Sequence, residues 1–403
     1  MNPVAVVVTG LGAVAPHGDV PGALFDALMR GQSAVRAVLP DLPKPTAAAL
    51  APFDASRWFT KLQLAGVDRV SQLAVAAADL AMTDAAAKGD VEPERLGVFA
   101  GCGMGGAAAL ELAYRNAGGR APPLTIPAFM PNAQASQVAM RHGAQGPVLT
   151  YSVACASASV AIAEAAKAVQ RGEVDVAIAG GSEALIVPGV VLAWQAMQTL
   201  ASFQPGEEAT SVRPFASDRS GFALGEGAAF IVLESAERAA RRGARVHARL
   251  AGWGLSCDAT HLTKPDAPGQ ARALRAALRS AGLQPRDVGY CNAHGTATRI
   301  GDVVERNALA DVWGDALDHL QVSSTKALHG HLLGAGGALE ALITVLALQR
   351  RELPPNAHCS SIDPACSLNL VPQAGASAPQ LEAAISNSFA FGGTNSVLLF
   401  TRA

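Results

Sequence analysis

The fold is decided by the stretch Phe222-Ala-Leu-Gly-Glu-Gly-Ala-Ala-Phe-Ile-Val-Leu-Glu234, because a similar stretch recurs near the end of the chain. The second copy reads Phe389-Ala-Phe-Gly-Gly-Thr-Asn-Ser-Val-Leu-Leu-Phe400, and each copy is a glycine turn that leads into an apolar strand. Each copy is preceded by a strand, a chemically distinctive segment and an Ala/Gly-rich helical run. The distinctive segment holds Cys155 in the first half of the chain, and it spans Lys326 to His331 in the second half. One repeat of this length predicts a duplicated domain, since solenoid repeats have periods of about 20–50 residues.

Around this repeat, strand-like apolar runs alternate with Ala-rich helical runs, which indicates an α/β fold. Val4 to Thr9 predicts the first strand, and Ser71 to Lys88 predicts a long helix. Residues 35–55 contain several prolines and predict an irregular loop. We place the boundary between the two halves in an Arg-rich helix, which divides the chain into residues 1–243 and 244–403.

Composition excludes several classes of protein. The 403 residues carry a net charge of −2, which argues against a nucleic-acid-binding protein. No stretch reaches the ~20 apolar residues of a membrane span, and the N-terminus lacks the basic segment of a signal peptide. The 6 cysteines include no Cys-x-x-Cys pair, so we expect neither a zinc site nor a disulfide framework. A reduced cytoplasmic setting is the simplest expectation.

Cys155 is the first candidate for chemistry. It lies in Tyr-Ser-Val-Ala-Cys-Ala-Ser-Ala-Ser, between an apolar strand and an Ala-rich helix. This pattern predicts a thiol at a helix N-terminus, where the helix dipole lowers a thiol pKa and favours the nucleophilic thiolate. The alternative for a lone cysteine is a small buried apolar residue.

Two histidines follow predicted strands and open glycine-rich turns. His294 lies in Asn-Ala-His-Gly-Thr-Ala-Thr, and His331 lies in Lys-Ala-Leu-His-Gly-His-Leu-Leu-Gly-Ala-Gly-Gly. Ligand sites of α/β sheets form at the carboxyl ends of strands, which favours both as site residues. Each histidine taken alone is equally compatible with a structural role.

The sequence suggests roles for two pairs of charged residues near these histidines. Lys326 lies at a predicted strand end, and Glu340 falls within an apolar helix, where a buried carboxylate needs a partner. We expect the two to pair. Asp302 and Glu305 fit a capping box at a helix start, which predicts a structural role for Asp302.

Taken together, these motifs resemble the type I/II β-ketoacyl-acyl carrier protein synthases, a family of condensing enzymes in the thiolase superfamily. The matching segments follow the family's order over essentially the whole chain: residues 7–12, 101–106, 154–157, 179–183, 213–215, 221–227, 294–298, 324–337 and 387–395. The resemblance implies a thiolase-like layered αβαβα sandwich built from two similar halves and normally dimeric.

The resemblance also implies catalytic roles. Cys155 would accept an acyl group from a carrier-protein thioester. His294 and His331 would bind the malonyl thioester and stabilise the enolate formed when CO2 leaves, because two neutral N–H donors aimed at one oxyanion form a preorganised electrostatic site. Lys326 and Glu340 would support that arrangement.

Substrate contacts are implied in the same way. The backbone N–H groups of Cys155 and Phe391 would form the oxyanion hole for acyl transfer, and Thr296 and Thr298 would hold the amides of the phosphopantetheine arm. Phe391 resembles the family's gating phenylalanine, and Met104 lies where relatives keep a gate to the acyl pocket. The implied partners are an acyl carrier protein and a second subunit, in a homodimer or in a heterodimer with a chain-length factor. Neither a metal nor a further cofactor is implied.

Some positions depart from the family pattern, among them Ala297, Gly301 and Gln198. The segment 57–69 also holds few basic residues for docking a carrier protein. The pathway therefore stays open between fatty acid, type II polyketide and aryl polyene synthesis.

Three other activities are weighed against this one. A thiolase would have a second cysteine in the late glycine turn, where this chain has Phe391. An initiating synthase would have Asn at His331. A non-catalytic chain-length factor would lack the nucleophile at Cys155.

Overall fold

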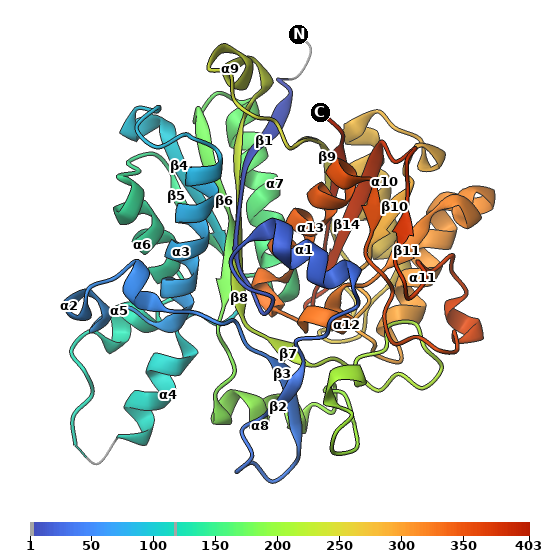
Figure 1. Ribbon diagram of the computed structural model, residues 1–403, viewed down its shortest axis with the longest axis horizontal. Helices are drawn as coiled ribbons and strands as arrows, with labels where there is room; N and C mark the ends of the chain where they lie inside the picture. The colour runs from blue at the N-terminus through green and yellow to red at the C-terminus, as the bar shows by residue number, and fades with distance from the viewer. Residues whose placement is uncertain (1–3, 117–118) are drawn as a thin grey trace.

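A ten-stranded sheet forms the frame of the molecule, in the order β11-β10-β14-β15-β9-β1-β8-β6-β4-β5 (Figure 1). The computed structural model describes residues 4–116 and 119–403. Five strands come from the N-terminal half: β1 (Val6–Val14), β4 (Leu96–Gly101), β5 (Val148–Tyr151), β6 (Val176–Glu183) and β8 (Gly227–Ser235). Five come from the C-terminal half: β9 (Ala248–Cys257), β10 (Tyr290–Asn292), β11 (Gln321–Ser323), β14 (Ala383–Phe389) and β15 (Thr394–Thr401).

The two halves repeat one topology. In each half the outer three strands are parallel, and the next two are antiparallel to their neighbours. The first strands of the halves, β1 and β9, pair antiparallel and join them. The prediction of two similar halves is confirmed. The division after residue 243 stays a prediction; it lies between α9 (Ala236–Arg241) and β9.

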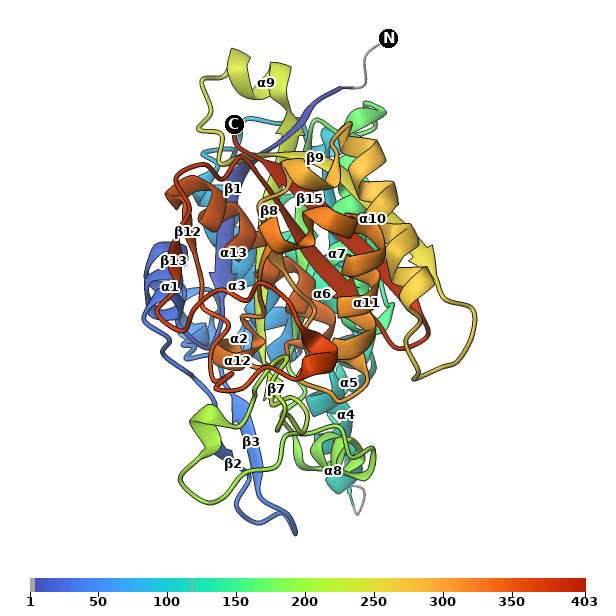
Figure 2. The same ribbon diagram turned by 90° about the vertical axis from the view of Figure 1, so that its right-hand side faces the viewer.

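Helices form three layers around the sheet. The central layer consists of α7 (Ser157–Gln170) and α13 (Gly336–Arg350), which contact each other between the two half-sheets (Figures 1 and 2). One outer layer holds α3 (Arg69–Asp84) and α6 (Ala133–His142), and the other holds α10 (Ala267–Ala281) and α11 (Gly301–Trp313). The predicted αβαβα sandwich is therefore confirmed.

Glycines in the two equivalent first strands explain the close helix packing. A Cβ added to Gly12 of β1 would overlap the Ala77 carbonyl oxygen of α3, and one added to Gly254 of β9 would overlap the Ala273 carbonyl oxygen of α10. Alanines on these helices keep the approach short, so each outer helix lies directly on the backbone of its strand.

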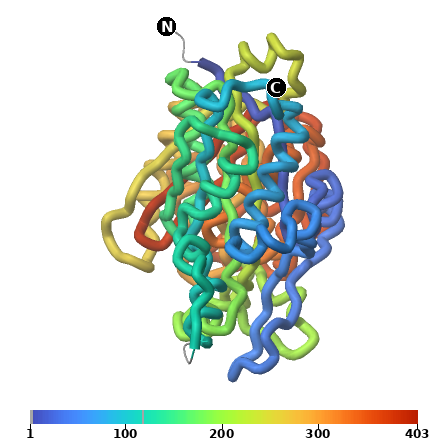
Figure 3. The backbone as a smooth tube through the Cα atoms, turned by 90° about the vertical axis from the view of Figure 1, so that its left-hand side faces the viewer, coloured from blue at the N-terminus to red at the C-terminus, as the bar shows by residue number. Residues whose placement is uncertain are grey.

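Shorter elements surround the sandwich. Residues 35–55, predicted as an irregular loop, instead contain β2 (Arg36–Val38) and β3 (Thr46–Ala49), and β3 pairs in parallel with β7 (Leu224–Gly225). The prolines Pro40, Pro43 and Pro45 lie between the two strands, where they remove no ladder hydrogen bond. This blue arm projects at the lower end of the molecule in Figure 3. The other helices and strands are α1 (Pro21–Met29), α2 (Lys61–Leu64), α4 (Ala107–Arg115), α5 (Thr125–Phe129), α8 (Pro188–Ala196), α12 (Lys326–His329), β12 (Glu352–Leu353) and β13 (Ala376–Ser377).

The topology brings the site residues together. The parallel strands of each half end at one edge, and the segments that follow β5, β10 and β11 carry Cys155, His294 and His331. Within residues 4–116 and 119–403, no helix is long and apolar enough to cross a membrane.

Candidate active site

Cys155 lies in a strained turn at the start of the central helix α7. The turn is a 3-10 helix, Ala154–Ala156, and it opens with Ala154 at a φ of 48°, a left-handed conformation that is rare for alanine. Ser157 stabilises the turn by accepting a hydrogen bond from Val153 N (2.9 Å) and donating one to Ala154 O (2.7 Å). The predicted placement of the thiol at a helix N-terminus is confirmed.

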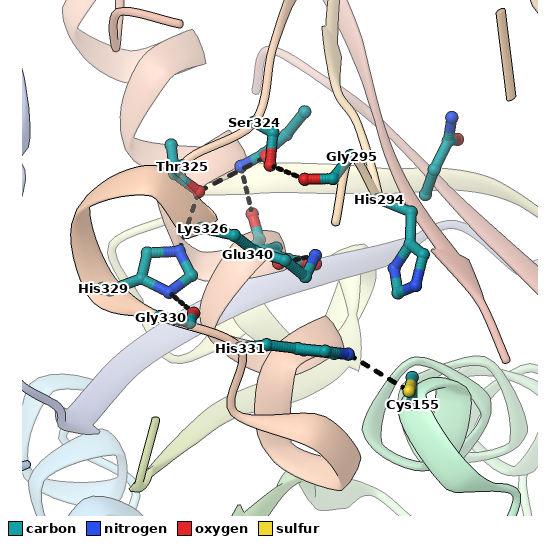
Figure 4. A network of polar contacts seen from close by, with 12 residues as sticks. Cys155, His294, Gly295, Ser324, Thr325, Lys326, His329, Gly330, His331 and Glu340 are labelled. Atoms are coloured by element: carbon teal, nitrogen blue, oxygen red, sulfur yellow. Dashed lines mark hydrogen bonds and ion pairs between the residues drawn. The ribbon is translucent and has the colours of Figure 1, made fainter. Parts of the chain in front are cut away.

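His331 points its ring at the thiol (Figure 4). Its Nε2 lies 3.1 Å from Cys155 Sγ, and its Nδ1 accepts a hydrogen bond from Leu333 N at 3.2 Å. Because Nδ1 accepts, the proton of a neutral ring resides on Nε2 and is directed at the sulfur. His331 is therefore held as an N–H donor.

His294 completes the cluster. Its ring centroid lies 5.4 Å from that of His331, at an interplanar angle of 81°. One ligand-type atom from each of Cys155, His294 and His331 lies within 4.8 Å of the others. The structure therefore brings together three residues that are more than a hundred positions apart from first to last.

A sulfur and two imidazoles are also a set that binds zinc in other proteins. Metal ligation needs a lone pair from each histidine. Leu333 N fixes the His331 tautomer with a proton toward Cys155, so this arrangement suits hydrogen bonding better than metal ligation.

Both histidines are neutral. Burial first, and the nearby Lys326 charge second, hold the pKa of His294 and of His331 well below the usual range. Lys326 is itself buried and forms an ion pair with Glu340, so the contact expected from the sequence is present. Burial raises the pKa of Glu340 to about 7, although Lys326 acts in the opposite direction.

The expected lowering of the Cys155 pKa is wrong. Burial raises the pKa of this thiol to about 12, although the Lys326 charge and the backbone N–H of Phe391 both lower it. The physical reason is that the thiolate loses its hydration in a closed site, and the dipole of one helix end does not replace it. In the free protein the sulfur is a thiol.

The capping-box interpretation of Asp302 and Glu305 is also wrong. The Glu305 carboxylate accepts hydrogen bonds from His294 N (2.9 Å) and Gly295 N (2.8 Å), and so fixes the backbone that carries the His294 imidazole. Asp302 accepts from Phe215 N at 2.8 Å. Sequence analysis missed the positioning role of Glu305; the available signal was an acidic residue in the first turns of the helix after the His294 motif.

A cavity of about 440 Å³ opens onto the cluster. Cys155, both histidines, Thr296, Thr298 and Phe391 all line it, together with Phe389, Trp194 and Phe222. The Thr296 and Thr298 hydroxyl oxygens lie 3.0 Å apart. The backbone N–H of Phe391 points at Cys155 Sγ. It could therefore donate a hydrogen bond to the carbonyl oxygen of a ligand bound between Cys155 and Phe391.

Two further residues, Trp194 and Met104, differ in their relation to this cavity. Trp194, which sequence analysis missed, stacks on Phe391 with ring centroids 6.1 Å apart. Met104 is 44% exposed and is absent from the described lining of this cavity. Its part in acyl selection stays a prediction.

Comparison with known proteins agrees with this geometry. Residues 4–239 match the family model described as Beta-ketoacyl synthase, N-terminal domain, and residues 247–360 match the C-terminal domain. The chain belongs to the β-ketoacyl synthase family.

Individual relatives align along nearly the full chain. This β-ketoacyl synthase is 37% identical to 3-oxoacyl-[acyl-carrier-protein] synthase 2 of Staphylococcus aureus (strain N315), and the match covers 98% of each chain. It is 40% identical to nodulation protein E of Rhizobium sp. (strain N33), again over 98% of each.

Solved structures show the same fold. A β-ketoacyl synthase from Burkholderia phymatum STM815 superposes with a TM-score of 0.92 at 35% identity, covering 99% of this chain and 100% of that one. A chain of the ishigamide ketosynthase/chain length factor superposes with a TM-score of 0.91 at 32% identity, covering 100% of both.

Proposed function

We propose that this β-ketoacyl synthase is an acyltransferase that joins an acyl group to a malonyl unit. Both substrates are thioesters of an acyl carrier protein, and the reaction is a decarboxylative Claisen condensation that yields a β-ketoacyl-carrier protein. The contact between His331 Nε2 and Cys155 Sγ, at 3.1 Å on the cavity floor, carries this proposal.

In the first half-reaction, Cys155 Sγ attacks the carbonyl carbon of the acyl thioester. The oxygen becomes an oxyanion, and the backbone N–H groups of Cys155 and Phe391 stabilise it. The carbon–sulfur bond to the carrier arm then breaks. The arm leaves as a thiol, having gained the proton that Cys155 lost, and the acyl group remains on Cys155.

In the second half-reaction, the malonyl thioester occupies the vacated cavity. Its carboxylate leaves as CO2, and the electron pair of the broken carbon–carbon bond forms an enolate whose oxygen faces the Nε2–H donors of His294 and His331. The enolate carbon attacks the acyl carbon on Cys155. The new carbon–carbon bond forms, the carbon–sulfur bond to Cys155 breaks, and the cysteine leaves as a thiolate that takes a proton from solvent water.

The buried pair Lys326 and Glu340 supports the histidines in this scheme. Burial first, and the positive charge of Lys326 second, keep the imidazoles neutral by lowering the pKa of each histidine. A neutral ring donates a hydrogen bond to an enolate without transferring its proton, so the intermediate keeps its carbanion character for the condensation.

The partners follow from the same proposal. An acyl carrier protein delivers both substrates on its phosphopantetheine arm, and no other cofactor takes part. The second subunit is a copy of this chain or a chain-length factor. The pathway makes fatty acids, type II polyketides or aryl polyenes, and the protein acts in the cytoplasm. A purely chain-length-factor role is the alternative; the presence of Cys155 beside both histidines weighs against it.

Intact mass spectrometry tests the proposal. Incubation with acyl-carrier proteins of several chain lengths should add one acyl mass to the wild-type chain. Cys155→Ala should abolish this addition, whereas Cys257→Ala, which removes an exposed thiol, should leave it unchanged. Acylation that persists in Cys155→Ala would contradict the proposed nucleophile. Absence of acylation with any carrier protein would favour the chain-length-factor alternative.

A further inference from the structure

The cavity that leads to Cys155 carries two exposed cations, Lys264 and Arg299. Both line the cavity, whereas Cys155 and His331 on its floor are buried. Within residues 4–116 and 119–403, neither cation forms an ion pair with a carboxylate. Two unneutralised charges on the lining of one cavity need an explanation that the condensation chemistry does not supply.

The acidic residues of the cavity do not balance these charges. Among the described lining residues the carboxylates are Asp258 and Glu305, and both are buried. Asp258 accepts from Asn395 Nδ2 at 2.6 Å and from Asp266 N at 3.1 Å. Since Glu305 is engaged by the His294 turn, the exposed part of the lining keeps a net positive charge.

The segment that carries Arg299 is held in place by a buried side chain, that of Arg219. The buried guanidinium of Arg219 donates to Thr298 O at 3.1 Å and to Arg299 O at 2.7 Å. Arg219 also pairs with Asp363 at 2.7 Å. The Arg299 backbone is therefore fixed beside Thr298, and the residue remains exposed.

The segment that carries Lys264 is organised as well. The ring of His261 accepts hydrogen bonds at Nδ1 from Thr263 N (3.1 Å) and Lys264 N (3.2 Å). Leu262 O accepts from Gly392 N at 2.7 Å, next to Phe391. Lys264 thus belongs to a segment that is bonded directly to the turn contributing the Phe391 N–H.

We propose that Lys264 and Arg299 bind the phosphate of the phosphopantetheine arm. This inference rests on the proposed function, because it assigns the outer end of the same substrate. The arm has a thioester at one end, amides along its length and a phosphate at the other end. The cavity lining offers a nucleophile, the hydroxyls of Thr296 and Thr298, and exposed cations to match them. Guanidinium and ammonium groups are the usual protein partners of phosphate.

Two small thioesters test the phosphate contact without a carrier protein: octanoyl-pantetheine and octanoyl-4′-phosphopantetheine. The rate of Cys155 acylation is measured for each by intact mass spectrometry at low salt. The wild-type protein should react about tenfold faster with the phosphorylated probe, since exposed charge pairs contribute only modestly to binding. The double variant Lys264→Ala/Arg299→Ala should react with both probes at one rate.

Salt and a matched variant sharpen the test. The preference for phosphate should shrink at high salt, because exposed charges are screened. Arg279→Ala removes an exposed charge of the same half that does not line the cavity, and it should retain the full preference.

The outcomes separate the two proposals. Equal wild-type rates with both probes, or a preference that survives in the double variant, would overturn the phosphate site while leaving the condensing activity intact. A wild-type protein that neither probe acylates would contradict the proposed function itself. A double variant that is slowed only with the carrier protein, and still prefers the phosphorylated probe, would assign the two cations to the carrier surface instead.

Discussion

The two central helices begin at turns that share a backbone conformation and differ in chemistry. The turn before α7 opens with Ala154 at a φ of 48°, and the turn before α13 opens with Leu333 at 45°. Cys155 and Gly334 occupy the same place in these turns. The first turn presents a thiol to the cavity, and the second presents a backbone N–H that donates to Glu183 at 3.0 Å. The duplicated fold therefore builds this turn, which we call the elbow, twice, and the sequence places a thiol on the first copy.

In a second pair of equivalent turns, the C-terminal half carries the distinctive side chain and the N-terminal half has a glycine. After β4, Gly103 N and Met104 N donate to the Glu183 carboxylate at 2.7 and 3.3 Å. After β10, His294 N and Gly295 N donate to Glu305 in the same way. His294 stands where the N-terminal half has Gly103, and a Cβ at Gly103 would crowd Glu183. Cys155 thus comes from one half of the chain, and His294 and His331 come from the other.

The largest expected effect comes from removing the one thiol that distinguishes the elbows. Cys155→Gln should abolish condensation, because no acyl-enzyme forms. It should still release CO2 from malonyl-carrier protein, since decarboxylation needs the donors of the other half. The measurements are product formation and CO2 release on one preparation. Loss of both activities in a folded variant would show that the halves do not divide the chemistry in this way.

Removing a donor of the C-terminal half should have the next largest effect. His331→Ala should still form the acyl-enzyme and should condense about 10²–10³-fold more slowly, the usual loss for one oxyanion donor. Acylation by mass spectrometry and the condensation rate are compared for the same protein. Normal condensation would contradict the donor role of His331.

Adding a side chain to the elbow before α13, which lacks a thiol, should lower the stability of the fold. A Cβ at Gly334 would overlap Gly103 N and Glu183 Oε2, so Gly334→Ala should lower the free energy of unfolding by about 1–3 kcal/mol, as overpacking does. Gly119→Ala is the matched control, because a Cβ there meets no atom of the described residues within 4 Å. Urea denaturation measures both. Equal stabilities would show that the elbow has room for a side chain.

Acid should destabilise the protein through the buried histidines. The pKa of His331 in the folded chain lies well below its value of 6.5 in the unfolded chain, so only the unfolded chain takes up the proton as the pH falls through 6.5. Stability is therefore lost on acidification. Between pH 7.5 and 5.5 the wild type should lose about 1.4 kcal/mol more than His331→Gln. An equal loss in both proteins would show that His331 titrates normally when folded.

The smallest effect is expected at Met104, in the turn whose counterpart carries His294. If this flexible side chain gates the acyl pocket, Met104→Ala should shift acylation toward longer chains, by about 0.8 kcal/mol for each additional buried CH2. Met104→Phe should restrict acylation to shorter chains and leave malonyl decarboxylation unchanged. Acyl-enzyme yield against chain length is the measurement. Coincident profiles for the three proteins would place the acyl tunnel elsewhere.

Local patterns in the sequence determined the fold and the candidate reacting groups. The recurrence of Phe222–Glu234 at Phe389–Phe400 predicted two halves, and the strand–turn–helix pattern at Cys155 predicted the elbow. The histidines were recognisable because each follows a strand and precedes glycines. These features depend on residues within a few positions of one another, so they are readable without knowing what packs against them.

The tertiary structure alone decided the electrostatics and the supporting contacts. The Cys155 pKa rises because distant segments bury the thiol, and Glu305 fixes His294 because this side chain of α11 reaches the turn that follows β10. Arg69, a basic residue of the segment expected to dock a carrier protein, instead pairs with Glu226, 157 positions away. The burial of a side chain and its choice of partner depend on all of its neighbours, and the fold brings many of these neighbours from other parts of the chain. The local sequence therefore specified which groups are present, and the fold set their charge states and their partners.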